Sequence, residues 1–165
     1  KDIRKNVSLC HEVVEFYSYL NNREPLYDSS RVLNVSRSVN DFRFFESIRG
    51  TKFNVKKALL DKFESQFEQD RSYLTERYMF SLKKDDADMQ AEMWSDDTIS
   101  LIDSYISRAP VFYRRQWIAF LRDRSIELEF DDLPLAMKLI SVCYKYKPQG
   151  RLIKNKYQSY KLRLA

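Results

Sequence analysis

The stretch SRSVNDFRFFESIRGTKFNVKKALLDKFESQF, residues 36–67, carries the pattern that decides the fold class. Its apolar side chains recur in steps of three before Gly50 and in steps of four after it, so each half has one apolar stripe if it is helical. Gly50 suits the left-handed residue that commonly ends a helix, and Asn54 suits the cap of the next one. The stretch therefore predicts two helices joined by a short turn.

Positive side chains surround this predicted turn. They are Arg37, Arg43, Arg49, Lys52, Lys56 and Lys57. Because the two apolar stripes need a core partner, the charges fall on the outer surface of the helix pair. Two interpretations stay open for them: ordinary solvated side chains, or a surface that binds phosphate groups.

Composition favours an all-α fold for the rest of the chain. The 165 residues include 2 glycines and 4 prolines, too few for the turns of a β-sandwich or a dinucleotide-binding α/β fold. Hydrophobic residues make up 44 % of the chain, enough to bury a core. No apolar run approaches the roughly 20 residues that a membrane-spanning helix needs, so we expect a soluble, cytoplasmic protein.

The charge changes sign along the chain. Residues 1–84 hold 16 basic and 12 acidic groups, residues 85–107 hold none and 7, and residues 108–165 hold 13 and 5. Because charge and hydrophobic pattern change together near residues 83–96, we predict two small helical domains, 1–84 and 85–165. The basic end of the second predicts a polyanionic partner, either nucleic acid or an acidic protein.

Cations and tyrosines are interleaved in YKYKPQGRLIKNKYQSYKLR, residues 144–163. Cations neutralise phosphates, and exposed aromatic rings stack on unpaired bases. The candidate DNA contacts in this half of the chain are Arg114, Arg115, Lys145, Lys147, Arg151, Lys154, Lys156, Lys161 and Arg163. The base-stacking candidates are Tyr144, Tyr157 and Tyr160, for which the other interpretation is a place in the core or at its rim.

The acidic segment DDADMQAEMWSDD, residues 85–97, contains large apolar side chains. Met89, Met93 and Trp94 are therefore candidates for binding a protein partner. The alternative interpretation is a connector whose Trp94 packs against one of the domains.

Residues suited to catalysis are scarce. His11 is the single histidine and falls inside a predicted helix, and the phosphate-cradling and hydrolase motifs are absent. Cys10 and Cys143 fall on apolar stripes, where a free cysteine behaves as a small hydrophobic residue. We therefore expect no enzyme activity, no cofactor and no metal. The remaining enzymatic alternative is a magnesium-dependent nuclease that uses Asp85, Asp86, Asp88, Asp96 and Asp97.

Four segments in order carry a family resemblance. They are VVEFYSYL at 13–20, NVSRSVNDFRFFESIRGTKFNVKKALLDKF at 34–63, WIAFLRDRSIELEFDDLPLAMKLISV at 117–142 and KNKYQSYKLRL at 154–164. The chain resembles the helicase-loading, or helicase assembly, proteins of T4-like bacteriophages over somewhat more than half its length. Those proteins share a first aromatic helix, a segment with a double phenylalanine, paired helices in the second half and a closing basic-aromatic helix.

The resemblance implies a non-enzymatic protein of two helical domains in the cytoplasm of a bacterial host. Such a protein binds forked and single-stranded DNA, contacts the single-stranded-DNA-binding protein and brings a hexameric replicative helicase onto the lagging-strand template. The resemblance also likens the amino-terminal domain to an HMG box, with duplex contacts at Arg37, Arg43, Lys52, Lys56 and Lys57. The same resemblance implies contacts with the fork arms or the helicase at Arg114, Arg115, Lys154, Lys156 and Lys161.

A rival hypothesis does not depend on the resemblance. In it the chain is a protein-binding adaptor or inhibitor whose basic face meets an acidic protein. Duplex, forked and single-stranded DNA are all candidate targets.

Overall fold

The structure of the protein is a computed structural model. It describes residues 9–27, 29–37, 45, 48, 50, 51, 68–70, 72, 73, 76, 77 and 94–165. The chain divides into two compact units, one made of Lys1–Lys52 together with Glu92–Ala165 and the other of Phe53–Ala91. The described residues of the second unit are helical and exposed, and the guanidinium of Arg77 lies 5.9 Å from the centre of the Tyr73 ring.

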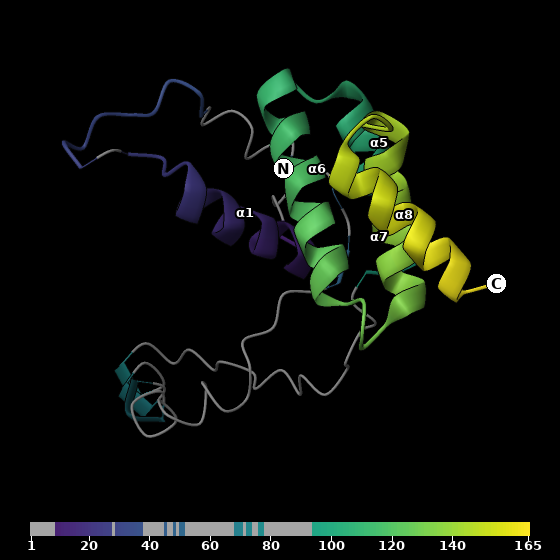
Figure 1. Cartoon of the computed structure of the whole chain (residues 1–165). Coiled ribbons are helices and arrows are strands. Elements are labelled where there is room, and N and C mark those ends of the chain that lie inside the picture. Colours follow the sequence, from purple (N-terminus) through teal and green to yellow (C-terminus); the bar gives the residue numbers. More distant parts are fainter. Residues whose placement is uncertain are drawn as a thin grey trace. The chain divides into compact units, whose positions relative to one another are not determined.

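The described part of the first unit is built from helices, which confirms the predicted all-α fold class. The helices are α1 (His11–Arg23), α5 (Asp96–Arg108), α6 (Val111–Glu127), α7 (Leu133–Tyr146) and α8 (Arg151–Arg163). Helix α6 contacts α1, α5 and α7, and α8 packs against α7 (Figure 1). Within the described ranges, no helix is both long enough and apolar enough to cross a lipid bilayer.

The amino-terminal ends of α5 and α7 follow from local sequence. Ser95 accepts a hydrogen bond from the backbone N–H of Thr98 at 3.3 Å, and Asp132 accepts one from Leu135 at 2.9 Å. Both side chains satisfy backbone donors that the first helical turn leaves without a partner. Pro134 lies in the first turn of α7, where its missing N–H costs nothing.

Aromatic rings form the centre of the core. Phe16 of α1 stacks on Trp117 of α6, with ring centres 3.9 Å apart and planes 11° apart. The ring of Phe45 lies 5.7 Å from Phe16 and 5.4 Å from Tyr105 of α5. All four side chains are fully buried. Helix α1 therefore shares one core with α5 and α6, across the domain boundary that the charge pattern predicts between residues 84 and 85.

Most of the predicted helix pair, residues 36–67, lies outside the described residues. Phe45 and Ile48 are described, and both are buried, as the predicted stripe requires. The prediction of a left-handed cap at Gly50 is wrong, because its backbone φ is not positive. Glycine is needed there for space instead, since a Cβ would lie 2.5 Å from Oε2 of Glu12.

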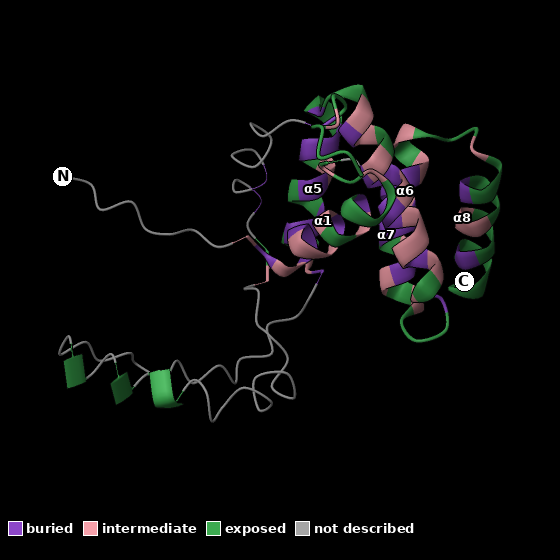
Figure 2. Ribbon diagram, turned by 90° about the vertical axis from the view of Figure 1, so that its left-hand side faces the viewer, coloured by how far each residue is buried: buried purple, intermediate pink, exposed green. Residues whose placement is uncertain are grey.

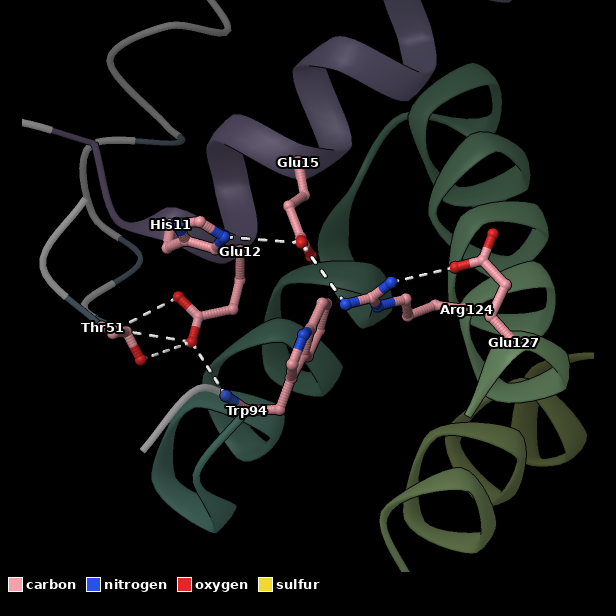
Figure 3. Close-up of polar contacts among 7 residues, drawn as sticks. All are labelled: His11, Glu12, Glu15, Thr51, Trp94, Arg124 and Glu127. Atoms are coloured by element: carbon pink, nitrogen blue, oxygen red, sulfur yellow. Dashed lines mark hydrogen bonds and ion pairs between the residues drawn. The ribbon is translucent and has the colours of Figure 1, made fainter. Parts of the chain in front are cut away.

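Glu12 joins three segments that are far apart in the sequence. Its carboxylate has no exposed surface and accepts hydrogen bonds from the backbone N–H of Thr51 at 3.1 Å and from the Thr51 hydroxyl at 2.8 Å. It also accepts one from the backbone N–H of Trp94 at 3.0 Å (Figure 3). Because a buried charge without partners is strongly destabilising, these donors are what permits Glu12 to occupy the core.

We expect Glu12→Gln to lower the free energy of unfolding by about 2–4 kcal/mol. A glutamine keeps one acceptor oxygen but turns an NH₂ group toward N–H donors, so at least one buried donor loses its partner. Urea denaturation followed by circular dichroism measures the change.

Glu15→Gln is the matched control on the same helix. The Glu15 carboxylate is one-quarter exposed; it lies 3.4 Å from Nε2 of His11 and forms an ion pair with Arg124 at 3.5 Å. We expect it to cost less than about 1 kcal/mol. Equal losses in the two variants would contradict the role assigned to Glu12.

Candidate nucleic-acid interface

Helix α8 packs through a narrow face and leaves most of its surface in water. Ile153 and Tyr160 are buried, Lys156 and Tyr157 are half-buried, and every other residue of 151–163 is exposed (Figure 2). The helix contains five cations and no acidic residue. Its inner and outer faces use these cations in different ways.

The inner face is anchored on Glu129, in the turn between α6 and α7. Its carboxylate accepts hydrogen bonds from the ammonium of Lys156 at 2.5 Å and from the hydroxyl of Tyr160 at 2.8 Å. Its backbone carbonyl accepts a hydrogen bond from the guanidinium of Arg163 at 3.0 Å. The hydrogen bond from Lys156, followed by that from Tyr160, holds the pKa of Glu129 below its usual 4.5.

These contacts correct part of the predicted interface. Tyr160 is fully buried, so its ring is not available to stack on a base. Burial, followed by the hydrogen bond to Glu129, also raises the pKa of Tyr160 to about 12. Lys156 and Arg163 are bound to Glu129 and hold α8 in place. No sequence pattern separates Glu129 from its exposed acidic neighbours, because its burial depends on the docking of α8.

The outer face carries the cations that remain unpaired. Arg151, Lys154 and Lys161 fall within about 80° of one another around the helix and span about 15 Å along it. Lys147, which follows the last residue of α7, is also exposed. Within the described part of the chain these four residues form no ion pair. We call Lys147, Arg151, Lys154 and Lys161 the outer basic face.

A pair of tyrosines borders the outer basic face. The rings of Tyr144 on α7 and Tyr157 on α8 are stacked, with centres 4.4 Å apart and planes 6° apart. Both side chains are half-buried. Of the three predicted stacking residues, the structure therefore brings two together at the seam between the helices.

Two predicted DNA contacts have structural partners instead. Arg37 is 7 % exposed, and its guanidinium donates to the backbone carbonyl of Glu24 at 2.5 Å and to the side chain of Asn21 at 3.1 Å. Arg114 donates to three backbone carbonyls at the end of α5 at 3.1–3.3 Å. Both side chains satisfy backbone acceptors, which removes them from the interface.

Other predicted cations differ in their pairing. Lys145 forms an ion pair with Asp103 of α5 at 2.7 Å, and that hydrogen bond raises the pKa of Lys145. Two turns earlier on the same face of α7, Lys138, which is not among the predicted contacts, pairs with Asp96 at 2.6 Å. Arg115 is exposed on α6 and forms no ion pair with any residue that the structure describes.

Trp94 is not a surface residue. It is 3 % exposed, and its ring centre lies 5.9 Å from that of Phe120. The prediction of Trp94 as a partner-binding residue is therefore wrong, and Trp94 packs in the core, as the alternative interpretation expects of it. Met89 and Met93 lie outside the described residues, as do five of the predicted DNA contacts. Those five are Arg43, Arg49, Lys52, Lys56 and Lys57.

Of the five carboxylates in the nuclease alternative, the structure describes only Asp96 and Asp97. Asp96 is exposed in the first turn of α5 and pairs with Lys138, while Asp97 is exposed beside it. Across the described ranges, no three histidine, cysteine or acidic side chains gather in a way that would hold a metal ion. Asp85, Asp86 and Asp88 lie outside those ranges.

Comparison with known proteins gives no matching family model, no matching curated protein and no matching solved structure.

The anchor of α8 predicts a pH dependence of stability. Because the pKa of Glu129 is lowered by folding, its stabilising effect is complete above the usual 4.5 and is lost as the pH falls through the lowered value. We expect Glu129→Gln to be less stable than the parent protein near neutral pH, with the difference shrinking as the pH falls below 4.5 and through the lowered pKa of Glu129. Urea denaturation at a series of pH values measures this.

Glu127→Gln is the control for this experiment. Glu127 is 63 % exposed and forms an ion pair with Arg124 at 3.0 Å. Its removal should leave the pH profile of the parent protein nearly unchanged. A Glu129→Gln profile that runs parallel to the parent profile at all pH values would contradict the anchor.

Proposed function

We propose that this chain is a non-catalytic DNA-binding protein that holds forked or single-stranded DNA on α8. The outer basic face carries this proposal, because Lys147, Arg151, Lys154 and Lys161 are exposed and form no ion pair within the described ranges. Cations that are free of carboxylates can replace the counterions condensed on nucleic-acid phosphates, and release of those counterions drives binding.

The resemblance to the helicase-loading proteins of T4-like bacteriophages supports the finer part of the proposal. On that basis the chain serves as a loader or adaptor that recruits a hexameric replicative helicase and contacts a single-stranded-DNA-binding protein. Helix α8 matches the closing basic-aromatic helix of that resemblance. The buried anchor at Glu129 supports the same role, because it fixes the helix and leaves its opposite side to a ligand.

A titration across forked, single-stranded and duplex DNA at several salt concentrations tests DNA binding directly. We expect retention of forked or single-stranded DNA, with an affinity that falls steeply as salt rises. No retention of any of the three, even at low salt, would refute the proposal.

A matched pair of double variants locates the binding surface. Lys154→Gln with Lys161→Gln removes two charges from the outer basic face, whereas Lys138→Gln with Lys145→Gln removes two that are paired with Asp96 and Asp103. We expect the first variant to weaken single-strand binding and to reduce the slope of log K against log salt by about 1.4, from 0.7 per phosphate contact. The second should change the slope much less. Equal effects would show that net charge, and not this face, determines binding.

A second candidate function is favoured by apolar groups beside the cations. Leu162 is 79 % exposed and Leu152 is 48 % exposed on α8, a pattern suited to a protein-binding adaptor or inhibitor that meets an acidic partner. A stable complex with one protein that survives nuclease treatment, combined with no DNA retention, would favour this candidate.

A further inference from the structure

Two tyrosines at the seam between α7 and α8 stack their rings on each other. Tyr144 and Tyr157 are parallel to within 6°, with ring centres 4.4 Å apart. Their mutual contact fills the position that a stacked base would take between them. A base could enter only by separating the two rings and losing that contact.

The hydroxyls of these tyrosines differ from those of their neighbours on the same helices. The Tyr146 hydroxyl donates to Asp103 at 2.7 Å, and the Tyr160 hydroxyl donates to Glu129 at 2.8 Å. The hydroxyls of Tyr144 and Tyr157 have no hydrogen-bond partner among the described residues. They are therefore the phenolic donors of this hairpin that remain available to a ligand.

Cations of the outer basic face flank the pair. Lys154 precedes Tyr157 by three residues and Lys161 follows it by four, so both lie on neighbouring turns beside the Tyr157 ring. Lys147 follows Tyr144 by three residues at the end of α7. Two open hydroxyl donors bordered by ammonium groups match an anionic oxygen ligand better than the flat face of a base.

We propose that the Tyr144–Tyr157 pair is a phosphodiester-binding site, in which the two hydroxyls donate to backbone phosphate oxygens and the flanking lysines neutralise the charge. The inference rests on the proposed DNA-binding function and specifies it further. The protein recognises the backbone of single-stranded DNA at this seam and gains no affinity there from base stacking.

The test uses two probes of equal length, a mixed-sequence single-stranded DNA and a strand made of abasic nucleotides. The full chain should bind both with similar affinity. The Tyr144→Phe, Tyr157→Phe double variant keeps both rings and removes both hydroxyls, and it should lose about tenfold in affinity for each probe. Tyr27→Phe is the control, because Tyr27 is an exposed tyrosine outside α7 and α8, and it should bind as the parent does.

The outcomes separate this inference from the proposed function. If the parent chain binds the mixed strand but not the abasic strand, and the double phenylalanine variant binds as the parent does, bases stack on the tyrosines and the inference is wrong while DNA binding stands. If the parent chain binds neither probe at low salt, the inference is wrong, and DNA binding then stands only if the parent chain still retains forked DNA under the same conditions. Thermal unfolding of the double variant should match that of the parent, since the stacked rings remain.

Discussion

A carboxylate with no exposed surface has to find its hydrogen-bond donors inside the protein, and Glu12 finds them on Thr51 and Trp94. This requirement fixes the start of α1 against the segment that leads into α5. One turn further along α1, Phe16 then meets Trp117 of α6, and the aromatic core follows from that contact. The packing of α6 against α1 is thus linked to a polar contact near the start of α1, because the same short helix supplies both the buried acceptor and the stacked ring.

Local sequence accounts for structural features that depend only on neighbouring residues. Ser95 and Asp132 cap their helices because a side-chain oxygen next to the first turn reaches an open N–H regardless of the rest of the fold. Gly50 shows the opposite case. Its predicted role used the backbone freedom of glycine, but its actual role is to leave room for the Glu12 carboxylate, which approaches from a helix about forty residues earlier. No local pattern records that approach, and the burial of Trp94 was equally open from sequence alone.

Charge counts predicted a basic carboxyl-terminal region but not which of its cations are free. Lys145 and Lys154 both lie near tyrosines in the same basic stretch, yet Lys145 meets Asp103 from α5 and Lys154 has no acidic partner in the described chain. The difference arises because α7 faces α5 whereas the outer side of α8 faces water. The domain boundary was placed from the same charge pattern, and the stack of Phe16 on Trp117 joins the two sides of it, because hydrophobic contact between distant segments leaves no trace in the order of charges.

Helix α8 has to be held in place without acidic residues of its own. Arg151 and Lys154 repel each other one turn apart, and Arg151 lies at the amino-terminal end, where the helix dipole disfavours a cation. Two buried side chains supply little apolar area to offset this. Glu129 supplies the missing anion from the turn before α7, and it does so on the inner side, where it binds Lys156 and Tyr160. An acid placed on α8 itself would stabilise the helix equally well but would neutralise the outer basic face. Locating the anion on another element therefore reconciles a stable helix with a surface that stays positive.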